Sequence, residues 1–151
     1  MNLFLMNRCS AAALLLCAAA GSYAQTDPLK AAAAEKGAVV TASGLVFRSL
    51  VEGKGASPAA TDTVRVHYRG TFPNGREFDS SHKRGEPASF PLNRVIKCWT
   101  EGVQRMKVGS KAKLTCPAAI AYGERGAGGG EIPPNSVLQF EVELLGIEGK
   151  S

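Results

Sequence analysis

Few side chains in this sequence could act as nucleophiles or metal ligands. Of its four cysteines and two histidines, Cys98 stands directly before the only tryptophan, Trp99, and Cys116 lies in the next apolar stretch. His67 and His82 are far from both cysteines along the chain, and no C-x-x-C pair occurs. This spacing does not match a zinc site or a dithiol redox site. We therefore expect neither a metal nor another cofactor.

Other catalytic motifs are also missing from the sequence. The glycine-rich stretch 123–134 (GERGAGGGEIPP) lacks the Lys-Ser/Thr pair of a phosphate-binding loop, and its Glu124 and Glu131 would repel phosphate. No Ser-His-Asp order or nucleophile elbow occurs. The net charge of +5 is spread along the chain without an arginine-rich run, which argues against nucleic acid as a partner. The sequence thus offers no covalent or metal chemistry.

A set of aromatic residues remains as the candidate site, namely Tyr68, Phe78, Phe90, Trp99, Tyr122 and Phe140. For any one of them, packing in the core is the simplest interpretation. Two of them stand beside residues that are not typical of a core. Asp79 follows Phe78, and the glycine-rich stretch begins directly after Tyr122. An apolar cup with a few polar groups at its rim is typical of a binding pocket.

Strands and one helix must position these aromatic residues. Alternating apolar residues predict strands around 45–47, 64–68, 90–92, 112–116 and 138–144. The stretch 71–78 (TFPNGREF) carries a Pro-Asn-Gly turn and predicts a hairpin. Residues 95–106 predict a helix, because Val95, Trp99, Val103 and Met106 share one stripe. The fold class is therefore α+β, an antiparallel sheet wrapped around one short helix whose Trp99 stripe covers the concave face.

The first residues predict a signal peptide, 1–24. Arg8 precedes an apolar run over 11–20, and the small residues of 22–24 (SYA) suit cleavage after Ala24. The run is about half of the ~20 residues that span a bilayer, so a retained anchor is less favoured. Lipoprotein processing at Cys17 is another alternative, although a bulky leucine precedes it. Cleavage would place the protein in the periplasm or outside the cell, without a membrane span.

The remaining chain predicts one domain. Residues 25–43 are assigned to a short helix, capped by Asp27, and a linker, and residues 44–148 to the domain itself. We expect a monomer, because the segment before the domain has no sustained apolar heptads. The stretch 80–89 is predicted as a polar loop that contains His82, and His67 is predicted to face solvent.

Four stretches of this sequence resemble the FKBP-type peptidyl-prolyl cis-trans isomerases, in order and at near-family spacing. They are VRVHYRGTFPNGREFDSS, VIKCWTEGVQRMKVGSKAKL, AYGERG and IPPNSVLQFEVELL. The resemblance extends from about Thr41 to Ile147, and TASGL is similar to the secreted bacterial branch, which is macrophage infectivity potentiator-like. The long dimerisation helix of that branch is missing. The resemblance implies an FKBP-like fold and isomerisation of X–Pro bonds in exported proteins. It also implies binding of proline-containing polypeptides and of macrolide immunosuppressant-type inhibitors.

The resemblance also implies a role for each site residue. Trp99 would form the pocket floor, and the walls would be Tyr68, Phe78, Phe90 and Phe140. Val95 and Ile96 would form an edge, with the Ile96 N–H donating to a substrate carbonyl, and Ile132 would cap the pocket. Asp79 would lie beside the twisting imide, held by Arg84, and Tyr122 would bond a substrate carbonyl. Phe78, Asp79 and Tyr122 are thus the expected catalytic residues.

Three positions depart from the family pattern. Ala88 stands where many members carry another aromatic residue, which would open one side of the pocket. The flap 126–134 (GAGGGEIPP) is one residue longer than the short eukaryotic form. Cys98 replaces a common glycine before Trp99.

The chemistry of X–Pro isomerisation suits an apolar cup. A barrier of about 18–20 kcal/mol comes from amide resonance, and twisting the bond removes that resonance. A dry pocket would favour the less polar twisted form without a nucleophile. The alternatives are a proline-directed binding module or chaperone with little turnover, and a thiol oxidoreductase, which the absent C-x-x-C disfavours.

We predict that Cys98 and Cys116 form a disulfide. Cys116 falls on the inward face of its strand with Ala112 and Leu114, and the Trp99 helix must pack on that face. An exported protein meets an oxidising compartment, and the even number of cysteines left after cleavage suits a pair. The alternatives are two buried free thiols and, less favoured, a catalytic Cys98.

Overall fold

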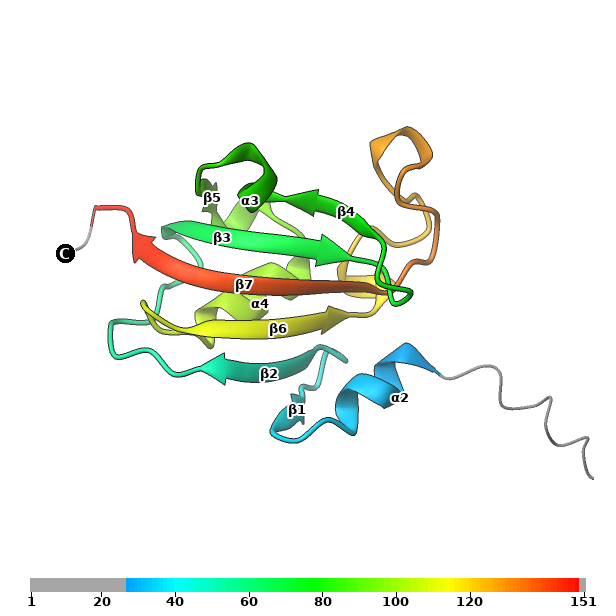
Figure 1. The fold of residues 1–151 in the computed structure, drawn as a ribbon, viewed down its shortest axis with the longest axis horizontal. Helices are drawn as coiled ribbons and strands as arrows, with labels where there is room; N and C mark the ends of the chain where they lie inside the picture. Colours follow the sequence, from blue (N-terminus) through cyan, green and yellow to red (C-terminus); the bar gives the residue numbers. More distant parts are fainter. Residues whose placement is uncertain (1–26, 150–151) are drawn as a thin grey trace, which may run out of the picture.

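Seven strands form one antiparallel sheet in the part of the chain that the structure describes, residues 27–149. In this computed structural model the strand order is β1-β2-β6-β7-β3-β4, and β5 pairs with β3 (Figure 1). The strands are β1 (Ala38–Val40), β2 (Val46–Val51), β3 (Thr63–Thr71), β4 (Glu77–Ser80), β5 (Ala88–Pro91), β6 (Lys111–Cys116) and β7 (Leu138–Ile147). The predicted signal peptide, residues 1–24, lies outside the described residues.

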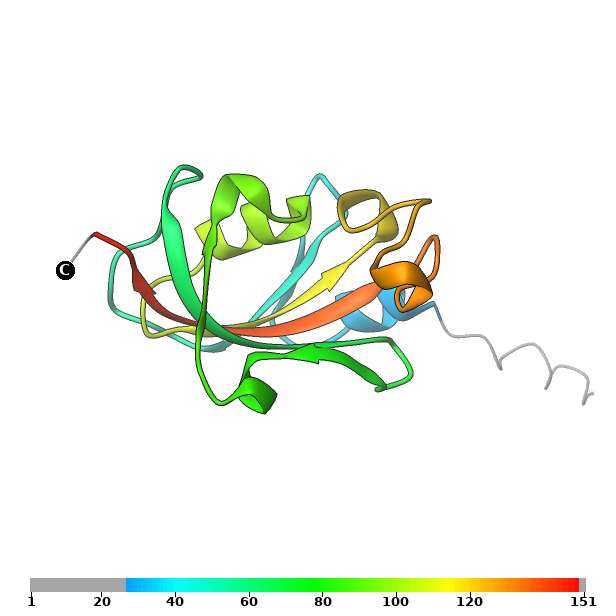
Figure 2. The ribbon, with the colours of Figure 1, turned by 90° about the horizontal axis from the view of Figure 1, so that it is seen from above.

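The helices are short, and one of them lies in the hollow of the curved sheet (Figure 2). They are α2 (Pro28–Ala33), α3 (Ser81–Arg84) and α4 (Lys97–Gln104), with single 3₁₀ turns η1 (Leu92–Arg94), η2 (Ala118–Ile120) and η3 (Gly128–Gly130). The helix predicted over 95–106 is α4, which begins later because Ile96 has extended backbone angles. The predicted α+β class is confirmed. No helix of the described chain is both long and apolar enough to cross a bilayer.

Strand alternation builds the core between the sheet and α4. Along β3, Val64, Val66 and Tyr68 are buried, whereas Arg65 and Arg69 are exposed on the outer face. From α4, Cys98, Trp99 and Val103 are buried against the concave face. Gly102 allows this close approach, because a Cβ atom there would lie 2.9 Å from both terminal carbons of Leu114.

The predicted disulfide between Cys98 and Cys116 is confirmed. The Cα atoms of the two residues are 5.9 Å apart, and both side chains are fully buried. The bond joins the first turn of α4 to the end of β6. It therefore ties the helix that carries Trp99 to the centre of the sheet.

The segment assigned to a linker is part of the sheet. Residues Ala38–Val40 form β1, which pairs antiparallel with β2. Two of its three residues are valines, whose β-branched side chains favour strands. The preceding α2 is held on the outer face by Glu35, whose carboxylate lies 3.0 Å from Arg48 Nη1 and 2.9 Å from Lys113 Nζ.

The polar loop predicted over 80–89 contains a helix, α3. The Ser80 side chain caps its start by accepting from the His82 N–H at 3.1 Å, and Gly85 ends it with φ of 74°. The prediction that His67 faces solvent was wrong. It is half-buried, its Nδ1 lies 2.8 Å from Ser81 Oγ, and its ring stacks on His82 at 4.5 Å, because α3 packs against β3.

Candidate active site

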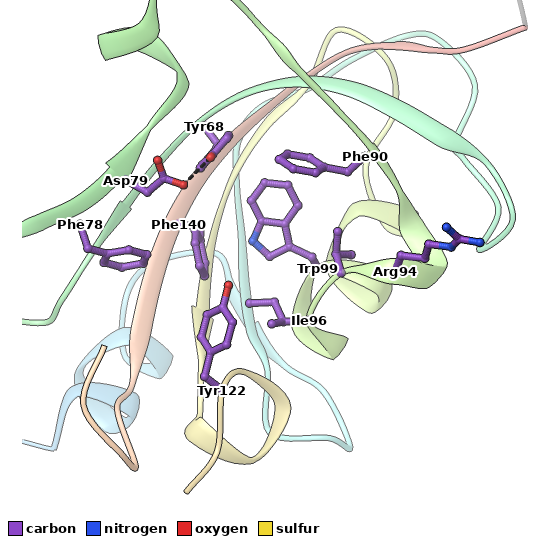
Figure 3. A pocket seen from close by; sticks show the side chains of 10 residues that line it. Tyr68, Phe78, Asp79, Phe90, Arg94, Ile96, Trp99, Tyr122 and Phe140 are labelled. Atoms are coloured by element: carbon purple, nitrogen blue, oxygen red, sulfur yellow. Dashed lines mark hydrogen bonds between the residues drawn. The ribbon is translucent and has the colours of Figure 1, made fainter. Parts of the chain in front are cut away.

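A pocket of about 450 Å³ opens beside α4 at the concave face of the sheet (Figure 3). Four strands (β3, β4, β5 and β7), the η1 turn, α4 and the segments beside them supply its lining residues. These are Tyr68, Phe78, Asp79, Phe90, Arg94, Val95, Ile96, Trp99, Tyr122 and Phe140. A volume of this size is typical of sites that take a small molecule or a few residues of a peptide.

Trp99 is the centre of an aromatic cluster. Its ring stands edge-to-face with Tyr68 at 5.2 Å, with Phe90 at 5.5 Å and with Phe140 at 5.5 Å between ring centres. Phe78 extends the cluster by contacting Phe140 at 5.6 Å. Each such pair stabilises the fold by about 0.5–1.5 kcal/mol beyond its buried area. The cup is therefore held in one shape by contacts among its own walls.

The indole nitrogen of Trp99 is buried without a hydrogen-bond acceptor among the described residues. Figure 3 places this nitrogen on the side of the ring that faces Phe140. An N–H directed at the face of an aromatic ring makes a weak attractive contact. The perpendicular Trp99–Phe140 arrangement is consistent with such a contact.

Gly70 makes room for the aromatic wall. A Cβ atom at this position of β3 would lie 2.6 Å from the tip of the Phe78 ring and 3.0 Å from Phe140. The β3–β4 pairing also shifts register between Gly70 and Thr71. Sequence reasoning did not identify Gly70, because nothing in the local pattern shows that two rings meet above it.

Asp79 is held at the rim by hydrogen bonds from several donors. Tyr68 Oη donates to Asp79 Oδ2 at 2.5 Å, and Arg84 Nη1 donates to Oδ1 at 2.7 Å. The Ser80 N–H also donates to Oδ1, at 2.9 Å. Arg84 Nη2 donates to Tyr68 Oη at 2.8 Å, which closes a triangle of contacts. The predicted role of Arg84 in holding Asp79 therefore has direct geometric support.

The network fixes the charge state of Asp79. Partial burial acts to raise the pKa of this carboxyl, but hydrogen bonds from Tyr68 and Arg84 outweigh it and hold the pKa below its usual value. Burial, with the hydrogen bond to Asp79, raises the pKa of the Tyr68 phenol. The hydrogen bond to Asp79 raises the pKa of Arg84. At neutral pH the site thus holds a carboxylate, a protonated phenol and a guanidinium.

Tyr122 lies at the rim, on the other side of Phe140 from Asp79 (Figure 3). It follows the η2 turn and is 40% exposed, with its hydroxyl directed toward the cup (Figure 3). Burial, and secondarily the charge of Asp79, raises the pKa of this phenol. The Tyr122 hydroxyl is therefore protonated at neutral pH and able to donate a hydrogen bond.

The structure brings together nearly all the predicted site residues. Nine of them line the pocket, namely Tyr68, Phe78, Asp79, Phe90, Val95, Ile96, Trp99, Tyr122 and Phe140. The exception is Ile132, predicted as a cap, which does not line the pocket and is 7% exposed in the core. Paired backbone bonds of 3.0 Å between Ala127 and Ile132 close the glycine-rich loop and hold Ile132 there. Ala88 is half-buried against the core.

Arg94 lines the pocket but was not among the predicted residues. It ends the η1 turn directly before Val95 and is exposed. Its position in the sequence next to Val95 and Ile96 was the only available signal.

The site is thus an aromatic cup with an ionised carboxylate and a neutral phenol at its rim. Residues 54–145 match the family model described as FKBP-type peptidyl-prolyl cis-trans isomerase. The chain belongs to this family.

Individual relatives agree with this assignment. FKBP-type peptidyl-prolyl cis-trans isomerase FkpA of Aeromonas hydrophila is 58% identical over 80% of this chain and 44% of its own length. The macrophage infectivity potentiator of Trypanosoma cruzi is 48% identical over 77% of this chain and 59% of its own. The crystal structure of FkpA from Escherichia coli superposes with a TM-score of 0.76 at 49% identity, covering 79% of this chain and 55% of that one. The chain thus spans about half the length of these relatives.

Proposed function

We propose that the protein is a peptidyl-prolyl cis-trans isomerase that accelerates X–Pro isomerisation during folding of exported proteins. The observation that carries this proposal is the aromatic cup around Trp99 with ionised Asp79 at its rim. Uncatalysed isomerisation takes tens to hundreds of seconds and limits folding. An enzyme for this step needs to stabilise the twisted bond, and no covalent intermediate is required.

The mechanism follows from the difference between the planar and the twisted imide. The planar form has resonance, a polar carbonyl and strong hydration, and twisting weakens all three. An apolar cup replaces water around the proline, so it binds the twisted form better than the planar form. Every kcal/mol of such preference multiplies the rate about fivefold, because 1.36 kcal/mol is tenfold.

The rim residues supply polar contacts in this proposal. Asp79 lies next to Phe78, where the twisting carbonyl would approach the carboxylate and the ring. Tyr122 and the Ile96 N–H donate to substrate carbonyls and so fix the peptide on either side of the proline. Arg84 keeps Asp79 ionised and oriented without contacting the substrate.

The partners and location are part of the same proposal. Proline-containing polypeptides are the substrates, and macrolide immunosuppressant-type compounds are expected to compete for the cup. The predicted signal peptide supports a periplasmic or secreted protein. We also propose a monomer. A stable dimer by light scattering at micromolar concentration would contradict that part.

A protease-coupled assay on a proline peptide tests the function. We expect turnover by the chain from residue 25 onward, and a loss of about a hundredfold in Asp79→Ala or Trp99→Ala, which corresponds to nearly 3 kcal/mol of lost transition-state stabilisation. Circular dichroism checks that each variant is folded. Full activity in both variants would refute the site. Peptide binding without turnover would instead indicate a binding module or chaperone.

A further inference from the structure

The two charged residues that line the pocket differ in how they are compensated. Asp79 is paired with Arg84, at 2.7 Å. The side chain of Arg94 makes no ion pair or hydrogen bond with any residue of the described chain. Figure 3 shows the two at opposite ends of the cup, with Trp99 between them. The Arg94 guanidinium, which is directed outward at that end of the pocket (Figure 3), therefore has no acidic partner in an ion pair among the described residues.

The neighbourhood of Arg94 adds to this charge. Lys97, three residues further on, is exposed and likewise has no ion-pair partner among residues 27–149. No acidic residue occurs in the first turn of α4, which begins at Lys97. The pocket rim thus has a balanced end at Asp79 and a cationic end at Arg94.

A peptide bound across the cup would pass both ends. Its backbone extends about 3.3–3.6 Å per residue, so residues within three positions of the proline reach the rim when the proline rests on Trp99. An acidic side chain there would meet Arg94, and a guanidinium binds a carboxylate through paired hydrogen bonds. A basic side chain at the same position would meet like charge.

We propose that Arg94 makes this pocket select X–Pro bonds that have an acidic side chain within three residues of the proline. The inference rests on the proposed function, since it names the substrates of the same site. Because Arg94 is exposed, the pair it forms is of the solvent-exposed kind. The preference for Glu over Gln should therefore be about two- to fivefold at low salt.

The preference should appear in binding and not in the turnover number. Arg94 lies at the far end of the cup from Asp79, so its contact with an acidic side chain is the same before and during the twist. An interaction made equally in both states lowers KM and leaves kcat unchanged. Salt should remove it, because the Debye length falls to about 3 Å at 1 M.

The test uses peptides with one X–Pro bond and Glu, Gln or Lys placed in turn at each of three positions on either side. Fluorescence of Trp99, the only tryptophan, reports binding, and exchange NMR reports turnover. We expect one position where Glu binds two- to fivefold better than Gln. In Arg94→Gln the ratio falls to about one, and in Arg94→Glu it inverts in favour of Lys. In Arg65→Gln, which removes an exposed arginine from the outer face, the ratio is kept.

A ratio of one at all positions, or an equal loss in Arg65→Gln, would overturn the inference. So would a ratio that survives in Arg94→Gln. Absent turnover with an Arg94-dependent binding ratio would refute the isomerase function and leave the inference standing. Absent binding of every peptide would overturn both.

Discussion

Reducing the Cys98–Cys116 disulfide should lower the stability of the domain and leave the pocket in place. The bond closes a loop with a sequence separation of 18. For that length the chain-entropy model predicts about 3 kcal/mol of stabilisation, through the unfolded state. The packing energy of the native state should change little, because two buried thiols pack as small apolar side chains. Trp99 and Val103 still hold α4 on the sheet.

The measurement is urea unfolding of the chain from residue 25 onward, with and without reductant. A slope of about 1–3 kcal/mol per M converts this loss into a midpoint shift of about 1–3 M. Domains have about 5–15 kcal/mol in total, so the reduced protein should stay folded and should keep most of its activity without denaturant. The Cys98→Ser/Cys116→Ser variant is the matched control, and its midpoint should not respond to reductant.

Thiol titration of the denatured, unreduced chain decides whether the bond exists in solution, with none free expected. An unchanged midpoint in a sample whose two thiols have both become reactive would refute the entropic reasoning. A collapse of activity without unfolding would show instead that the bond positions Trp99.

Further predictions concern the rim and the core. The pKa of Asp79 is below its unfolded value of about 3.9, so its contribution to stability should be complete above about pH 5 and lost as the pH falls through the folded value. This loss should be measurable as a drop in urea midpoint that Asp79→Asn lacks. Tyr68→Phe removes a hydrogen bond to Asp79 and should raise the pKa of that carboxyl, seen by NMR titration, whereas an unchanged pKa would contradict the proposed network. Gly102→Ala should destabilise by about 1–3 kcal/mol, since its Cβ would meet Leu114 at 2.9 Å, and a higher unfolding temperature would show that Leu114 can move aside.

The features that the sequence predicted correctly are those that follow from a short repeat of apolar residues along the chain. Alternation along β3 and β7 and the stripe led by Trp99 identify the sheet, the helix and the inward faces. The disulfide followed because Cys116 shares its inward face with Leu114. Most site residues came from the family resemblance, since an isolated aromatic residue does not show whether it lines a cup or fills a core.

The features that were missed depend on contacts between distant segments. The α3 helix starts from a local Ser80 cap, but it is kept by packing on β3 through Ser81 and His67. Ile132 turned out to be buried, because its loop closes through Ala127. The role of Gly70 depends on where two rings from other strands meet. None of these contacts produces a repeating pattern of apolar residues in the sequence.

The placement of α2 on the outer face has a consequence for how the molecule can change. Lys113 points outward to Glu35, at 2.9 Å, while its neighbour Leu114 packs inward against α4. Effects of mutations at sites without shared partners usually add independently. The sheet therefore separates the two sites. Substitutions in α2 on the outer face should leave the geometry of the aromatic cup on the inner face unchanged.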